Sequence, residues 1–108
     1  MTVYDLSKNS QFNVLTMPEP EREINGVYIG DLLSWVMGRA EADNIWITIM
    51  SNINVIAVAS LSDVSCVLLA EDVTLDSELL NTAKEKGINI LSTPLAAYEA
   101  ATKLSGMI

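Results

Sequence analysis

The chain has 108 residues, of which half are hydrophobic and 19% are charged, and its formal net charge at pH 7 is -8. This length and composition predict one folded domain over residues 1–108 with a substantial hydrophobic core. Because 14 acidic residues outnumber 6 basic ones, the surface repels phosphate groups, and we expect neither nucleic acid nor a membrane as a partner.

The sequence has no histidine and a single cysteine, Cys66. It therefore lacks the commonest general base and metal ligand, and it can form neither an internal disulfide nor a thiolate metal cluster. We expect Cys66 to be buried in a strand as a small hydrophobic residue, and we expect no metal and no cofactor. Residues 1–10 lack a basic segment followed by an apolar one, and no apolar run reaches the roughly 20 residues that span a bilayer, which favours a cytoplasmic protein.

The first part of the chain predicts two short strands. Residues 1–10 are polar and are expected to lie loosely against the rest of the domain. Residues 12–16 predict a strand that ends before Pro18, since proline has no N–H to donate to a neighbouring strand. Residues 24–29 predict a second strand, in which the Asn-Gly dipeptide at 25–26 indicates a bulge or a tight turn.

A short amphipathic helix is predicted over residues 31–37. Its leucine and valine side chains are spaced to form one apolar stripe, and Asp31 is placed to act as its N-cap. Gly38 is expected to end this helix, and a polar loop follows it.

Two apolar runs, residues 45–50 and 64–70, predict the central strands. Apolar side chains occupy both faces of the first run, which is typical of a parallel strand covered on both sides. The residues between the runs, 52–61, are rich in β-branched side chains and would also suit a strand. We favour a helix there, because two parallel neighbouring strands require a crossover connection.

The last third of the chain continues the alternation of strands and helices. Residues 75–87 predict a helix with Asp76 as N-cap and Gly87 in the left-handed conformation that ends it. Residues 88–91 predict a strand, and a final helix follows with Thr93 as N-cap and the next residue, a proline, in its first turn. The pattern predicts an α/β fold: a single three-layer domain with a mixed, mostly parallel sheet of about five strands and about four helices.

Three segments of the chain resemble the DRTGG domain, a module that is related to the N-terminal domain of HPr kinase and is found beside CBS domains. They are residues 26–35 (GVYIGDLLSW), 55–71 (VIAVASLSDVSCVLLAE) and 84–94 (KEKGINILSTP). The resemblance covers about residues 12–104 and implies a compact α/β domain, commonly dimeric, with a regulatory or ligand-sensing role. We expect this chain to be a stand-alone member of the family. It does not imply kinase activity, because HPr kinase carries that chemistry in a separate domain whose phosphate-binding loop, G-x-x-x-x-G-K-[ST], does not occur here.

The motif that gives this family its name is altered in the chain. The resemblance places it at Glu21, Arg22, Glu23 and Gly26, so that the arginine and one glycine are kept, the acidic residue is longer and the threonine is lost. Arg22 and Gly26 are the two matching positions, and they are therefore candidate ligand contacts. Arg22 and Arg39 are also the only guanidinium groups available to bind an anion.

Other candidate ligand contacts lie in the loops that follow the predicted parallel strands. These loops meet at one edge of the sheet, where helix N-termini present free N–H groups. The candidates are Gly30, Asp31, Ser51, Asn52, Ser92 and Thr93, with Tyr28 close to them in sequence. The alternative is that Asp31 and Thr93 serve only as helix caps. No spaced ligand set such as D-x-D-x-D-G is present, so no metal site is predicted.

A homodimer interface is predicted on two helices. Trp35 and Met37 are exposed if the apolar stripe of their helix is already complete, and aromatic residues and methionine are enriched at interfaces. The alternative is that Trp35 wraps over the edge of the core. Val55, Val58 and Ala59 form a further apolar surface on the 52–61 helix for which a second subunit is the expected partner.

The sequence therefore predicts a non-catalytic regulatory module that dimerises and senses a small anionic ligand, with a nucleotide as one candidate, or relays a signal to a partner enzyme. The alternative is a purely structural or adaptor subunit of a larger complex with no small-molecule ligand. An enzyme is disfavoured, because the chain lacks histidine, a phosphate-binding loop and a G-x-S-x-G nucleophile elbow.

Overall fold

Five strands and five helices make up the computed structural model, which describes residues 1–108. The strands are β1 (Asn13–Thr16), β2 (Gly26–Ile29), β3 (Asn44–Thr48), β4 (Cys66–Leu69) and β5 (Ile90–Ser92). The helices are α1 (Val3–Ser7), α2 (Leu33–Arg39), α3 (Ile53–Ser62), α4 (Ser77–Glu85) and α5 (Ala97–Ser105). None of the helices is both long enough and apolar enough to cross a membrane; the longest, α3, has ten residues.

The sheet has the strand order β1-β5-β4-β3-β2, with β2 to β5 parallel and β1 antiparallel to β5. This confirms the predicted mixed, mostly parallel sheet. The two apolar runs lie side by side as β3 and β4, in a register that pairs Ile45 with Cys66. α3 crosses between them, so the helical interpretation of residues 52–61 is confirmed over the strand alternative.

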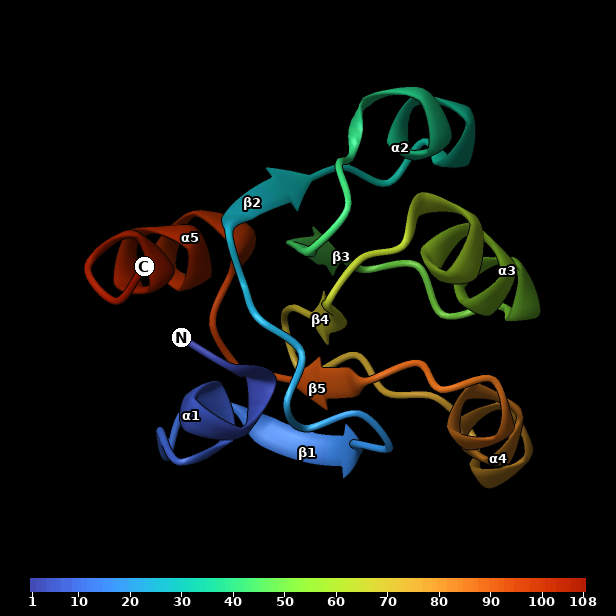
Figure 1. The fold of residues 1–108 in the computed structure, drawn as a ribbon, viewed down its shortest axis with the longest axis horizontal. Coiled ribbons are helices and arrows are strands. Elements are labelled where there is room, and N and C mark those ends of the chain that lie inside the picture. The colour runs from blue at the N-terminus through green and yellow to red at the C-terminus, as the bar shows by residue number, and fades with distance from the viewer.

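The sheet separates two hydrophobic cores, which makes the domain three-layered (Figure 1). α2, α3 and α4 cover one face, and α1 and α5 cover the other. Alternation along β3 sends Trp46 into the first core and Ile45 and Ile47 into the second, and all three are fully buried. Each buried side chain of this size contributes roughly 1.5 to 3 kcal/mol, so β3 is central to the stability of both layers.

The prediction that residues 1–10 lie loosely is wrong, because they form α1 and pack into the second core. A capping box begins this helix: the Thr2 hydroxyl accepts the N–H of Asp5, and the Asp5 carboxylate accepts the N–H of Thr2. Val3 and Leu6, three residues apart, are fully buried. Burial of two large side chains compensates for the short length of the helix.

Two helices begin later than predicted. Leu32 is the N-cap of α2, and Ala96 is the N-cap of α5, and neither side chain makes a capping hydrogen bond. The predicted caps Asp31 and Thr93 are engaged elsewhere, as described below. The predictions for α4 are confirmed: the Asp76 carboxylate accepts the N–H of Leu79, and Gly87 has a φ of 73°.

The prediction that the apolar residues of α3 face a second subunit is wrong. Val55, Val58 and Ala59 are buried within the chain, where they belong to the core between α3 and the sheet. A crossover helix beside a parallel sheet is sandwiched between the sheet and its neighbouring helices, here α2, so apolar residues around much of its circumference find partners in the same chain.

Candidate functional site

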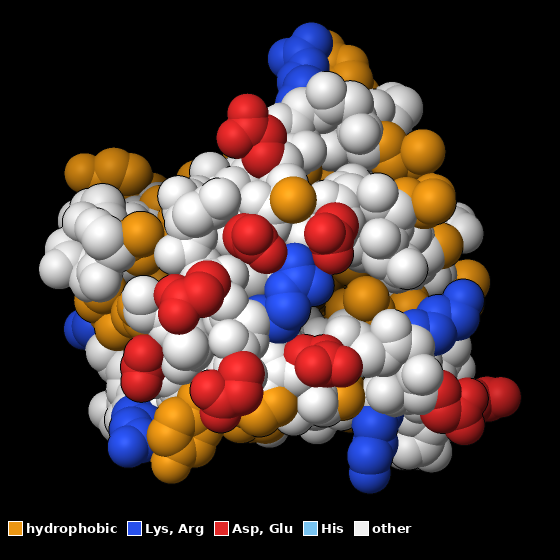
Figure 2. All heavy atoms as spheres, viewed as in Figure 1, with side chains coloured by type: hydrophobic (Ala, Val, Ile, Leu, Met, Phe, Trp, Pro, Cys, Tyr) orange, Lys and Arg blue, Asp and Glu red, His pale blue; other side chains and the backbone are white.

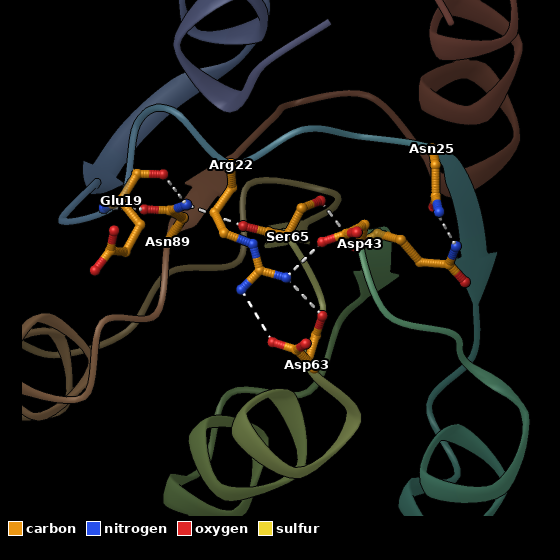
Figure 3. Close-up of polar contacts among 8 residues, drawn as sticks. Glu19, Arg22, Asn25, Asp43, Asp63, Ser65 and Asn89 are labelled. Carbon is orange, nitrogen blue, oxygen red and sulfur yellow. Dashed lines mark hydrogen bonds and ion pairs between the residues drawn. The ribbon is translucent and has the colours of Figure 1, made fainter.

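Arg22 joins the amino ends of the central strands. Its guanidinium donates to the carboxylate of Asp43 at 2.7 Å, to the carboxylate of Asp63 at 3.1 Å and to the main-chain oxygen of Asp63 at 2.8 Å (Figure 3). Asp43 directly precedes β3, and Asp63 ends α3 just before β4. The segment between β1 and β2 is thereby tied to both loops that enter the centre of the sheet.

Both aspartates of this cluster adopt the left-handed conformation, with φ of 68° at Asp43 and 56° at Asp63. Short polar side chains tolerate this conformation better than most others. Partial burial opposes the charge on Arg22, but the hydrogen bonds and charges of the two aspartates outweigh it and raise the pKa of Arg22 above its ordinary value. In Figure 2 the centre of this face holds a basic side chain between acidic ones, so the positive charge is locally neutralised.

Two asparagines complete this end of the sheet. The buried side chain of Asn89 donates to the main-chain oxygens of Glu19 and Ser65 and accepts the N–H of Glu19 (Figure 3). Asn44 donates to the side chain of Asn25, and its amide nitrogen would lie only 3.1 Å from a Cβ at Gly26. Gly26, the glycine predicted to match the motif, therefore leaves room for the side chain of Asn44.

The first of the predicted ligand loops is closed by hydrogen bonds. The Asp31 carboxylate accepts the hydroxyl of Thr48 at 2.7 Å and the N–H of Ile49 at 3.0 Å, which links the ends of β2 and β3. The main-chain oxygen of Gly30 accepts the indole N–H of Trp46, and the Tyr28 ring lies against the Cα of Gly30. Asp31 thus positions two strand ends instead of capping α2.

The other predicted loops differ in exposure. Ser51 is exposed, and the side chain of Asn52 caps α3 by accepting the N–H of Asn54. Ser92 and Thr93 are buried, and the Thr93 hydroxyl accepts the N–H of Leu95. Ser92 ends β5 and Thr93 follows it, and β4 lies between β5 and β3. The two residues are therefore separated from the exposed ends of β2 and β3.

The predicted ligand set is therefore divided between the two ends of the sheet. Arg22 and Gly26 lie at the amino ends of the parallel strands, whereas Gly30, Asp31, Ser51 and Asn52 gather at the carboxyl ends of β2 and β3. Ser92 and Thr93 follow β5, which is separated from β3 by β4.

Exposed apolar side chains concentrate around the carboxyl ends of β2 and β3 and on α2. They are Ile29, Leu32, Trp35, Met37, Ile49 and Ile53, here called the α2 surface. Trp35 is 52% exposed, and the guanidinium of Arg39 stacks on its ring at 3.7 Å from the centroid. The prediction that Trp35 and Met37 are exposed is confirmed, and Figure 2 shows hydrophobic side chains along the side of the molecule that α2 and α3 occupy.

Two grooves open on other parts of the surface. The larger, of about 570 Å³, lies between β1 and α4, and the smaller, of about 390 Å³, lies between α5 and the loop that follows α1. None of the predicted ligand contacts lines either groove. Sequence reasoning missed both, because each is formed by segments far apart in the chain.

Cys66 is fully buried in β4, as predicted. Burial raises the pKa of its thiol to about 12, although a hydrogen bond with Ser65 and the charge of Arg22 act in the opposite direction. The thiol is therefore neutral at physiological pH, and Cys66 fills space in the second core.

These features together define a small α/β domain whose β1–β2 connection closes the amino ends of a mixed sheet. Compared with protein-family models, the chain matches the DRTGG domain over residues 5–107. The chain belongs to the DRTGG domain family, which confirms the resemblance found in the sequence.

A solved structure with a similar fold contains the CBS and DRTGG domains of the regulatory region of Clostridium perfringens pyrophosphatase, in complex with its activator diadenosine tetraphosphate. The TM-score is 0.65 and the sequence identity is 17%, a level that shows the fold alone. The similarity covers 86% of this chain and 40% of that chain. No curated protein matches the sequence.

Proposed function

We propose that this chain is a non-catalytic regulatory module that forms a homodimer through its α2 surface and binds a small anionic ligand, a nucleotide in the first instance, whose signal it relays to a partner protein. The observation that carries the proposal is the family match, which extends over residues 5–107. A chain with the same fold belongs to a regulatory region that was solved with a dinucleotide activator.

The α2 surface supports the dimer. More than half of the large exposed hydrophobic side chains of the molecule lie between residues 29 and 53. Apolar side chains that gather in one part of a surface mark an interaction site, whereas scattered ones are normal. Trp35 has the properties of a central contact, because tryptophan and arginine, which stack here, are both enriched among residues that dominate binding energy.

The ligand contacts proposed for this role are Gly30, Ser51 and Asn52, at the carboxyl ends of β2 and β3. Loops at this end of a parallel sheet are where open α/β folds bind ligands. Ser51 and Asn52 are exposed there, and Asp31 holds the two strand ends together beneath them. Arg22 is a weaker candidate, because two carboxylates already neutralise it.

Sedimentation velocity tests the dimer. The wild-type chain is expected to sediment as a dimer over about a hundredfold range of concentration, and Trp35→Glu is expected to shift it to monomer by placing a charge in the interface. Tyr98→Glu is the matched control, since Tyr98 is 79% exposed on α5, outside the α2 surface. A wild-type chain that is monomeric at every concentration, or a Trp35→Glu variant that stays dimeric, contradicts this part of the proposal.

Titration with ATP and with diadenosine tetraphosphate, followed by amide chemical shifts, tests the ligand. Binding is expected to move the signals of residues 30 and 51–54, and Ser51→Glu is expected to weaken it about tenfold by charge repulsion. Ser105→Glu, an exposed change at the end of α5, is expected to leave binding unchanged. A dimer that responds to neither nucleotide would favour the structural or adaptor subunit instead.

A further inference from the structure

β1 is an edge strand whose outer side is open. It pairs with β5 alone, so alternate main-chain N–H and C=O groups along its other edge have no strand beside them. Such an edge is a template on which an extended segment of another chain can form main-chain hydrogen bonds. Pro18, just after β1, limits this template to a few residues.

α4 forms a wall beside this edge, and the two elements enclose the groove of about 570 Å³. The wall consists of Ser77, Leu80, Asn81 and Lys84, whose spacing places them on one stripe of the helix. Residues 14–18 line the opposite side of the groove. Figure 1 shows β1 and α4 next to each other at the end of the sheet opposite β2.

The charge of the groove is opposite to that of the whole molecule. None of its nine lining residues is acidic, although the chain has 14 acidic residues and a net charge of -8. Lys84 is the one charged residue among them, and no carboxylate lies within ion-pair distance of it. The groove therefore favours a segment that carries a carboxylate.

We propose that the groove between β1 and α4 binds an extended acidic segment of a partner protein, which adds a strand to the β1 edge. Its main chain pairs with β1, an apolar side chain packs against Leu80 and Met17, and an Asp or Glu side chain pairs with Lys84. The inference rests on the relay role proposed above and names the chemistry of the partner. It is separate from the α2 surface, which lies at the other end of the sheet.

A second copy of this chain is a poorer occupant than an acidic segment. Pairing of β1 with the β1 of another copy would bring residues 13–18 into the groove, and these residues (NVLTMP) include no carboxylate. That segment offers Lys84 no carboxylate, whereas an acidic segment supplies one.

A phage-displayed library of random decapeptides, selected on the intact chain, tests the proposal without assuming a sequence. We expect the enriched peptides to alternate apolar residues with Asp or Glu, and a labelled synthetic copy of one to shift the amide signals of residues 13–18 and 77–84. Lys84→Glu is expected to weaken its binding at least about tenfold. Methylation of alternate main-chain nitrogens of the peptide is expected to abolish binding, because it removes the donors that pair with β1.

Lys103→Glu is the matched control, because Lys103 occupies the last turn of α5 as Lys84 occupies the last turn of α4. It is expected to leave binding unchanged, and thermal unfolding shows whether either variant is destabilised.

Asn81→Trp, which fills the groove without a change of charge, is expected to block the peptide. The proposal is overturned if no peptide is enriched, if the peptides match residues 13–17 of this chain, or if they bind Lys84→Glu as well as wild type. None of these outcomes alters the dimer or nucleotide measurements.

Discussion

Arg22 and Asp43 form the shortest ion pair of the structure, with 2.7 Å between the guanidinium nitrogen and the carboxylate oxygen. Arg22 is also the arginine that the sequence resemblance predicts to match the motif from which the DRTGG family takes its name. In this chain it is a link between the β1–β2 connection and the loops that enter β3 and β4. The glycine that follows it, Gly26, lets Asn44 approach. Both matched positions thus have a structural explanation at the amino ends of the sheet.

Replacement of Arg22 by alanine is expected to lower the free energy of unfolding by roughly 1 to 2 kcal/mol, because it removes charged hydrogen bonds to two aspartates that are themselves partly exposed. Urea denaturation measures the loss. Since salt weakens such pairs, the loss is expected to shrink at high ionic strength.

Arg39→Ala provides the comparison for Arg22→Ala. Arg39 makes no ion pair and contacts Trp35 at the surface, so its loss is expected to cost less than about 1 kcal/mol. If the two variants were equally stable, the Arg22 cluster would have no structural role.

The order of the elements could be predicted from local patterns, because strands β3 and β4 are strongly apolar and the segment between them is too long for a hairpin. The residues at which the helices and strands begin and end could not be predicted in the same way. Asp31 has the residue type of a helix cap, but the Thr48 hydroxyl and the Ile49 N–H, both distant in sequence, compete for its carboxylate. α1 did carry a local signal, because the spacing of Thr2 and Asp5 is that of a capping box.

The candidate site was less predictable than the fold. Asp43 and Asp63 lie 21 and 41 residues beyond Arg22, so only the assembled sheet brings the three together. A local signal existed at Asp63, because a short polar residue between a helix and a strand favours a left-handed cap. The groove beside β1 carried no such signal, since its two walls are about 60 residues apart.

Asn89→Ala is expected to be the most destabilising of the polar substitutions, with a loss of about 2 to 4 kcal/mol. The Asn89 side chain is buried and bonds three main-chain groups, two on Glu19 and one on Ser65. Alanine would remove all three bonds, and of these groups the Glu19 oxygen keeps the N–H of Arg22 as a donor. Thermal and urea unfolding measure the effect. Asn54→Ala, an exposed change on α3, is expected to stay within about 0.5 kcal/mol of wild type, and a similar loss at both positions would contradict the prediction.

Alanine substitution is expected to have opposite effects at two glycines. Gly87 ends α4 with a φ of 73°, so Gly87→Ala is expected to cost about 1 kcal/mol, although the space around it would admit a Cβ. The prediction that Gly38 ends α2 is wrong, because the helix continues to Arg39. A Cβ at Gly38 would meet no atom within 4 Å, so Gly38→Ala is expected to stabilise the chain by about 0.5 to 1 kcal/mol. Urea denaturation of both variants checks the signs, and equal shifts would show that backbone conformation does not decide the outcome.

Cys66 is expected to make stability fall at alkaline pH. Burial raises the pKa of its thiol from 9.0 to about 12, so between these values the unfolded chain ionises while the folded chain keeps the proton. The contribution of Cys66 is complete below pH 9 and declines above it by at most about 1.4 kcal/mol per pH unit. Cys66→Ala, which loses about 1 kcal/mol at neutral pH through the space it leaves, lacks this decline. The stability difference between wild type and variant is therefore expected to shrink and then to reverse its sign as pH rises, because the two proteins differ only at residue 66. A constant difference would indicate that the thiol reaches solvent.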